Sequence, residues 1–239
     1  MPGPLAAGGA DKIPSIEVSG ILGATSDYVY RGVSLRDEAP TPFAYISAKL
    51  GTVYLDGFLI GAELGNDALG RGLGTIEADV TLGVRPRIEA VEFNLGARYT
   101  AYPNGRDLIA GTLEKAERDF IEPFAGATVH VTEQLSFGGT LYWTPDYFYE
   151  TGRVVTVEGH VGLVLPSCGA LSSKLTAFGG RAKSEQPFVV SPGDSYVYYN
   201  VGVEAQVERM LFDFRYWSTD VDGFRLFDPR FVVSAGVAF

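Results

Sequence analysis

The last nine residues, Phe231-Val-Val-Ser-Ala-Gly-Val-Ala-Phe239, constrain the fold of this chain most strongly. Successive side chains of a β-strand point to opposite faces, so this stretch has one uniformly apolar face and one face of mostly small residues. In a soluble protein a long apolar edge invites aggregation. A closed transmembrane β-barrel pairs its last strand with its first and turns the apolar face to lipid. An edge strand of a soluble β-sandwich is the alternative interpretation of these residues.

The same alternation recurs along the whole chain. It is cleanest in two neighbouring stretches, Ile76–Val84 and Val91–Tyr99, where apolar residues alternate with Glu, Asp, Asn, Arg, Thr and Gly. Template matching finds about twelve strands, and their connections alternate between long and short, as in outer-membrane barrels. We therefore predict an all-β fold, a closed antiparallel transmembrane up-and-down β-barrel of about 12 strands. It would span residues 15–239 and follow a flexible segment at 1–14.

Several details of this barrel can be anticipated from the pattern. The first strand is expected to run from Ile16 through Gly32. The stretch Val53–Leu64 alternates poorly, so its faces are not assigned. The ranges 65–74 and 103–118 are expected to be loops, the second being the longest, and a turn is expected at 166–170. Aromatic residues near strand ends are expected to form interfacial belts: Tyr28, Tyr30, Tyr99, Trp143 and Tyr216.

Composition excludes several classes of protein. No apolar run approaches the length of a membrane helix, but barrels hide their hydrophobicity in alternation. The net charge of −10 argues against nucleic acid as a partner. The single cysteine, Cys168, excludes an internal disulfide framework and a cysteine-based zinc site. An outer-membrane protein is expected to carry an export signal, but the N-terminal residues lack the pattern of a signal peptide.

Four blocks of sequence resemble a known family. The stretch Ser26-Asp-Tyr-Val-Tyr-Arg-Gly-Val-Ser34 is similar to the signature of the TorF family of porin-like bacterial outer-membrane proteins, whose substrates are largely undefined. The stretches 99–103, 120–126 and 142–152 look like later blocks of that family, in the same order. The resemblance covers most of the chain. It implies a pore-forming barrel and supplies no catalytic residue and no solute. A terminal Phe239 after alternating residues also resembles the signal read by the barrel assembly machinery.

The functional candidates are the charged residues on the inward face. A mid-depth basic residue on the lipid face of a barrel costs roughly 2–4 kcal/mol, so confinement of charge to one face indicates a wet or internally paired lumen. The residues predicted to line a pore are Asp27, Arg31, Glu77, Asp79, Arg85, Glu92, Arg98, Glu122, Glu158, His160, Glu204, Asp213 and Arg215. Asp27 and Arg31, near the outer end, could shape a constriction.

An enzyme is not expected. The only histidines, His130 and His160, are predicted to face inward among carboxylates, and no serine lies in an evident nucleophile motif. A metal site built from both histidines with Glu122 or Glu158 is conceivable but unspecific, so we expect no cofactor and no metal.

The expected function is passive diffusion of small polar solutes or ions through the outer membrane. An inward excess of carboxylates predicts a weak preference for cations. Two alternatives remain: a non-conducting structural or binding barrel, and a soluble β-barrel that binds an apolar ligand. The sequence does not give the oligomeric state.

Overall fold

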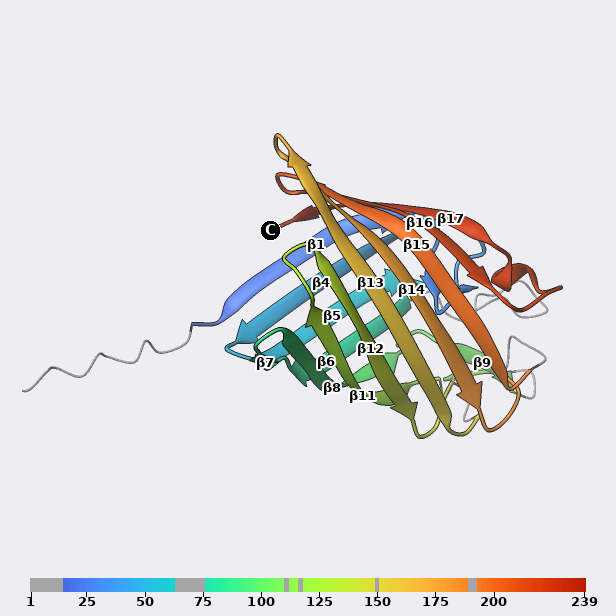
Figure 1. The fold of residues 1–239 in the computed structure, drawn as a ribbon. Helices are drawn as coiled ribbons and strands as arrows, with labels where there is room; N and C mark the ends of the chain where they lie inside the picture. The colour runs from blue at the N-terminus through green and yellow to red at the C-terminus, as the bar shows by residue number, and fades with distance from the viewer. Residues whose placement is uncertain (1–14, 63–75, 110–111, 116–117, 149–150, 189–192) are drawn as a thin grey trace, which may run out of the picture.

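A computed structural model of the chain describes residues 15–62, 76–109, 112–115, 118–148, 151–188 and 193–239. These residues form a closed antiparallel β-barrel of twelve long strands (Figure 1). Each barrel strand pairs with its neighbours in sequence order, and the last strand pairs with the first. The expected segment at 1–14 and the expected loop at 65–74 lie outside the described residues.

The barrel strands have the following bounds: β1 Glu17–Thr25, β4 Thr41–Leu50, β5 Val53–Gly61, β6 Ile76–Val84, β8 Val91–Ala101, β11 Phe120–His130, β12 Leu135–Thr144, β13 Val154–Cys168, β14 Leu171–Ser184, β15 Ser195–Val207, β16 Met210–Thr219 and β17 Arg230–Ala238. The shorter elements are β2 Val29–Tyr30, β3 Val33–Ser34, β7 Arg87–Ile88, β9 Arg106–Ile109, β10 Thr112–Lys115 and the 3-10 helix η1 Arg225–Phe227. Among the described residues, no helix is long and apolar enough to cross a membrane.

Connections at the two ends of the barrel differ in length, as predicted. The short turns lie at the end where β1 begins and β17 finishes, which we call the terminal end. The long connections lie at the opposite end, the loop end. Loop 1 is defined as residues 26–40 and loop 6 as residues 220–229.

The last residue of the chain completes the closure of the barrel. β17 pairs with β1 in register, and Gly20 and Phe239 exchange two backbone hydrogen bonds of 3.0 Å each. The Phe239 ring lies over Gly20, where an added Cβ would stand 2.4 Å from the ring atom Cζ. The terminal aromatic residue therefore occupies space that only glycine leaves free.

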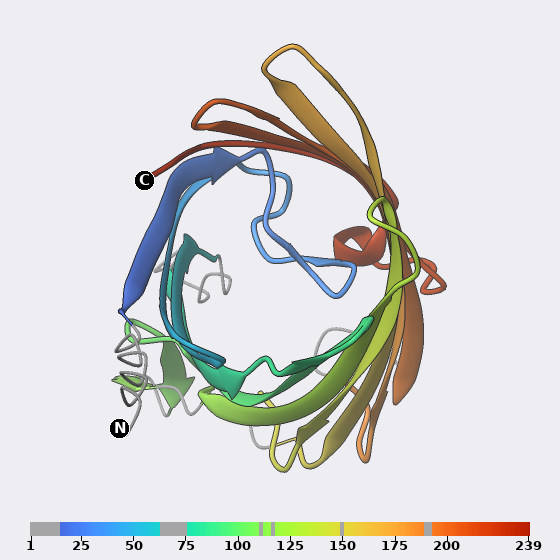
Figure 2. The ribbon, with the colours of Figure 1, turned by 60° about the vertical axis from the view of Figure 1, so that its left-hand side comes forward.

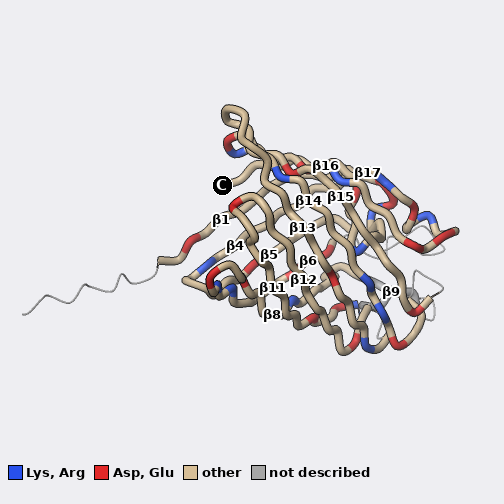
Figure 3. Tube along the Cα trace, viewed as in Figure 1, with Lys and Arg blue, Asp and Glu red and all other residues tan. Residues whose placement is uncertain are grey.

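The distribution of side chains is inverted relative to a soluble protein. Large apolar residues face outward, with Leu22 58% exposed and Phe231 77% exposed. Carboxylates lie inside, with Glu77 3% exposed and Glu122 fully buried. Figure 3 shows that most of the barrel wall is uncharged, with Lys, Arg, Asp and Glu at scattered positions along the strands. This arrangement is that of a transmembrane barrel and not of a soluble calyx.

The predicted course of the first strand is wrong beyond Thr25. Loop 1 turns into the lumen (Figure 2), so Tyr28 and Tyr30 lie inside and do not join an interfacial belt. The cause is a tight hairpin in which β2 and β3 pair across the two residues Arg31 and Gly32. Tyr99 and Trp143 do lie exposed on the outside, as expected.

Other boundaries also differ from the predictions. The expected loop 103–118 contains a small hairpin, β9–β10. The expected turn at 166–170 is much shorter, because β13 continues through an irregularity to Cys168. In β5 the inward residues Tyr54, Phe58 and Ile60 are themselves apolar, which explains why this strand alternates poorly in sequence.

Candidate functional site

The centre of the lumen is reached by the hairpin of loop 1. Arg31 and Gly32 both have positive φ, 49° and 81°, as the central residues of a two-residue type I′ turn require. Gly32 presses against the wall, where a Cβ would lie 2.5 Å from Cγ2 of Thr219 and 2.8 Å from Cβ of Tyr198. Glycine at this position therefore permits both the turn and the close approach.

Arg31 connects loop 1 to the opposite wall. Its guanidinium donates two hydrogen bonds to the Glu122 carboxylate, at 2.9 and 3.0 Å, and its Nε donates to Oε1 of Glu158 at 3.3 Å. It also lies 4.9 Å from the centre of the Tyr142 ring. A planar guanidinium that is paired in this bidentate way holds a fixed position.

Glu122 gathers further partners. Arg98 donates to its Oε1 at 2.6 Å, and Thr144 donates to its Oε2 at 3.0 Å. Tyr198 donates to Oε1 of Glu158 at 2.5 Å. A buried charge is tolerated when its lone pairs and protons are satisfied, and here two arginines face two carboxylates. We call Arg31, Arg98, Glu122 and Glu158 the central cluster.

A second acidic group lies beside it. Glu77 accepts hydrogen bonds from Tyr28 and, at 2.7 Å, from Tyr102, and Asp79 accepts from Thr100 at 2.6 Å. Burial, and next the Glu77 carboxylate, raise the pKa of both the Tyr28 and the Tyr102 phenols well above the ordinary value. A phenol is protonated at neutral pH even at its ordinary pKa of about 10, so both hydroxyl groups act as donors to Glu77.

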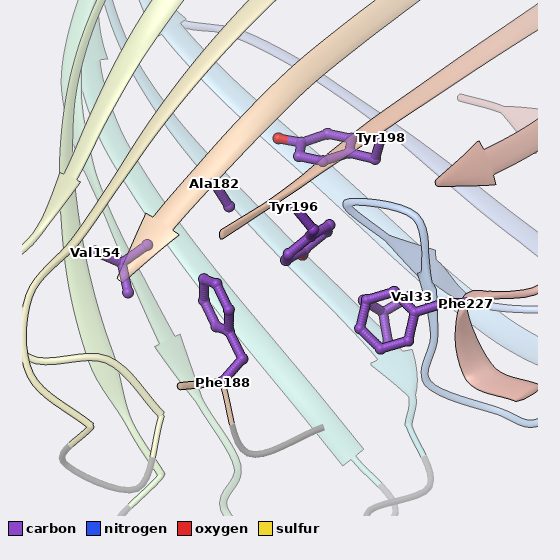
Figure 4. Packing of buried hydrophobic residues seen from close by; sticks show 7 residues of the cluster. All are labelled: Val33, Val154, Ala182, Phe188, Tyr196, Tyr198 and Phe227. Atoms are coloured by element: carbon purple, nitrogen blue, oxygen red, sulfur yellow. The ribbon is translucent and has the colours of Figure 1, made fainter. Parts of the chain in front are cut away.

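Aromatic residues fill the lumen toward the loop end (Figure 4). The cluster combines barrel-wall residues with residues from the connections: Val33, Val154, Ala182, Phe188, Tyr196, Tyr198 and Phe227. Tyr196 packs edge-on against both Phe188 and Phe227, with ring centres 5.3 Å apart in each case. Burial raises the pKa of the neighbouring Tyr147 to about 12. The loop end of the barrel thus has a packed core of its own.

The remaining predicted residues lie apart from the central cluster. Arg215 bonds Asp213 at 2.6 Å and Glu204 at 3.2 Å, beside a cavity of about 350 Å³ in the terminal half of the lumen. Arg85 stacks 3.9 Å from the centre of the Tyr54 ring. His160 lies 3.3 Å from Thr128. Glu92 is half-buried on β8, opposite Thr128 of β11.

Some lumen residues were not anticipated from the sequence. Arg230 donates to Asp27 at 3.1 Å, and both are buried. Extending the alternation of the final strand back by one residue would have placed Arg230 on the inward face with Val232 and Ser234. Nothing in the sequence marks Thr144 as a hydrogen-bond partner of Glu122. In the part of the chain that the structure describes, no group of three or more His, Cys, Asp or Glu side chains could hold a metal ion.

Comparisons with solved structures find outer-membrane barrels. A KdgM porin structure matches with a TM-score of 0.58 at 9% identity, covering 93% of this chain and 98% of that one. A NanC porin structure gives 0.57 at 9% identity, covering 92% and 98%. The COG4313 outer membrane channel from Pseudomonas putida F1 gives 0.50 at 12% identity, covering 98% and 99%. At these identities the likeness shows the fold alone. No protein-family model and no curated protein sequence matches the chain.

Proposed function

We propose that the chain is a narrow, porin-like channel of the bacterial outer membrane that lets small hydrophilic solutes or ions diffuse passively. The observation that carries the proposal is the inversion of the barrel: apolar side chains outside, and charged residues around cavities inside. The similarity of the fold to porin structures supports it. The resemblance to the TorF family points the same way, and membership of that family remains part of the proposal.

The lining of this channel would be drawn from the thirteen residues predicted from the sequence, with residues 15–239 forming the pore unit. A twelve-stranded barrel is intermediate between small barrels filled by side chains and sixteen-stranded aqueous porins. Loop 1 narrows the lumen further through the central cluster. An excess of inward carboxylates supports a weak preference for cations. Its partners would be outer-membrane lipid and, through Phe239, the barrel assembly machinery.

Conductance in planar lipid bilayers tests the proposal. Purified, folded protein is expected to give discrete conductance steps that are smaller than those of a sixteen-stranded porin in the same salt. Insertion of correctly folded barrels, shown by a heat-modifiable band in electrophoresis, without any steps would contradict it.

The second candidate is a non-conducting barrel that serves as a scaffold or binds a partner. It is favoured by the buried ion pairs and the aromatic core that fill the centre and the loop end of the lumen. Absence of conductance steps from folded wild-type protein inserted in the bilayer would support this candidate. It would also require that variants with a loosened central cluster remain silent.

A further inference from the structure

Two cavities follow one side of the lumen, where β16, β17 and β1 adjoin, and a third lies beyond them at the rim of the barrel. The first, of about 350 Å³, lies in the terminal half beside Ile21, Phe43, Asp213 and Ser234. The second, of about 250 Å³, shares Phe43, Asp213 and Ser234 with the first and continues past Trp217 to Asp27. They therefore adjoin each other along the same wall.

The third cavity lies at the loop end. It measures about 360 Å³ and is lined by Ser26, Asp27, Glu38, Pro229, Arg230 and Phe231. It shares Asp27 with the second cavity. The three spaces thus form a series from one end of the barrel toward the other, and Asp27 stands at the last junction.

Asp27 and Arg230 close that junction. Their ion pair spans 3.1 Å, and their side chains are only 3% and 4% exposed. Ser34 donates to the other oxygen of Asp27 at 2.8 Å. Arg230 also donates to the backbone oxygens of Asp228 and Arg225, at 3.0 and 2.7 Å, so the pair joins loop 1 to loop 6.

The opposite side of the lumen offers a contrast. There the central cluster places Arg31 and Glu122 in direct contact, and both are buried. The Glu122 oxygens accept hydrogen bonds from Arg31, Arg98 and Thr144. Glu158 accepts hydrogen bonds from Arg31 and Tyr198. Opening this side would require several buried charges to lose partners at once, whereas the seam is interrupted only around Arg230, which pairs with the buried Asp27 and, at 3.8 Å, with the exposed Glu38.

We propose that solutes cross the barrel along this seam of β16, β17 and β1, and that the Asp27–Arg230 pair is its constriction. The inference rests on the proposed channel function and deepens it by locating the path. The solutes that fit are small and polar or charged, because any solute on this path must pass the Asp27–Arg230 pair, which presents both signs of charge.

Thiol modification after folding tests the path without changing the fold. In a Cys168→Ser background, Ser234→Cys places a thiol at the wall shared by the first two cavities. Thr81→Cys is the matched control, since Thr81 is also inward and half-buried but lies on β6. A small cationic methanethiosulfonate reagent is expected to lower the conductance of the Ser234→Cys channel at least threefold and to leave the Thr81→Cys channel within about a third of its starting value.

Removal of the ion pair tests the constriction. Arg230→Gln and Asp27→Asn are each expected to raise conductance at least twofold. Arg153→Gln, which removes an exposed ion pair with Glu185 in the long connections, is the control and is expected to leave conductance unchanged.

The outcomes separate the two proposals. If wild-type steps appear but modification at 234 does not reduce them, or modification at 81 reduces them equally, the seam path is wrong while the channel stands. Unchanged conductance in both Arg230→Gln and Asp27→Asn likewise rejects the constriction alone. If the folded wild type and all variants give no conductance, the channel proposal is wrong, and the proposed path is wrong with it.

Discussion

Of the two carboxylates in the central cluster, Glu122 binds both arginines, whereas Glu158 binds Arg31. Glu122 lies fully buried on β11 and binds Arg31, Arg98 and Thr144. The pairs give little net stability relative to an apolar core, because desolvation of the charges offsets their attraction. Removing one partner is different, since it leaves the other charges buried without compensation.

We therefore expect Glu122→Gln to lower the free energy of unfolding by about 3 kcal/mol, as is typical when a buried pair is broken. Glutamine keeps the size of the side chain but cannot neutralise two guanidinium groups. Urea unfolding of the barrel folded in detergent micelles, followed by tryptophan fluorescence, measures the change.

The matched control is Glu185→Gln, which makes the same substitution in an ion pair with Arg153 at 2.7 Å whose side chains are about half exposed. An exposed pair contributes roughly 0–1 kcal/mol, so this variant is expected to differ little from wild type. Similar effects of the two substitutions would show that the central cluster does not hold the lumen as described.

At the scale of single residues, the sequence predicts orientation better than partnership. Period-two alternation places Glu122, Arg98 and Glu158 on the inward face, and the structure finds Arg98 there in contact with Glu122, and Glu158 in contact with Arg31. It could not reveal that Arg31 reaches Glu122, because that contact joins residues 91 positions apart through a loop. Nor could it distinguish Tyr198, which binds Glu158, from other inward aromatic residues.

At the scale of elements, loop 1 shows where the alternation pattern fails to predict the end of a strand. The alternation of residues 26–32 continues that of β1, so the pattern predicts one long strand. The break depends on the positive φ of Arg31, an unusual residue for the first position of a type I′ turn, where Asn, Asp or Gly is favoured. The glycine that follows was the available signal, although a single glycine in a strand pattern can equally indicate a bulge.

The junction of β1 and β17 is the element on which closure depends. Gly20→Val is expected to weaken it, because a side chain there meets the Phe239 ring and also the backbone oxygen of Tyr45, 2.9 Å from the added Cβ. The Phe239 ring can rotate away, but the Tyr45 backbone of β4 cannot move without disturbing the pairing of β4 with β1 and β5. Loss of the heat-modifiable band of the folded barrel should occur at a temperature several degrees lower than in wild type.

Leu22→Val serves as the comparison for this effect. Leu22 lies two residues further along β1, faces outward and is 58% exposed, so a smaller apolar side chain there leaves the pairing with Val237 intact. Equal melting of the Gly20→Val and Leu22→Val barrels would mean that the contact between the terminal ring and Gly20 is unimportant for closure.

At the scale of the whole molecule, the alternation and the lengths of the connections were enough to predict the barrel. A period of two fixes which side chains share a face, and alternating long and short connections fix an up-and-down order. The contents of the lumen were not predictable in the same way. They depend on loops that fold inward and pack Val33, Phe188 and Phe227 against the wall, and such packing has no sequence period.

The net charge of −10 is distributed so that carboxylates remain available in the terminal half of the lumen. The side chain of Glu204 is 48% exposed beside the terminal cavity of about 350 Å³, and its ion pair with Arg215 spans 3.2 Å. A negative charge at such a point raises the local concentration of cations. We therefore expect the wild-type channel to be more permeable to K⁺ than to Cl⁻ in a salt gradient.

Glu204→Gln should reduce this preference, because it removes the charge and keeps the size of the side chain. The effect should be large at about 0.1 M salt, where the screening length is about 10 Å, and small at about 1 M, where it is about 3 Å. Glu185→Gln removes an equal charge from the long connections at the loop end and should shift the reversal potential less. Preference for Cl⁻ in wild type at low salt would contradict the expectation, and so would an equal shift in both variants, because the charge in the terminal cavity would then not govern which ions enter.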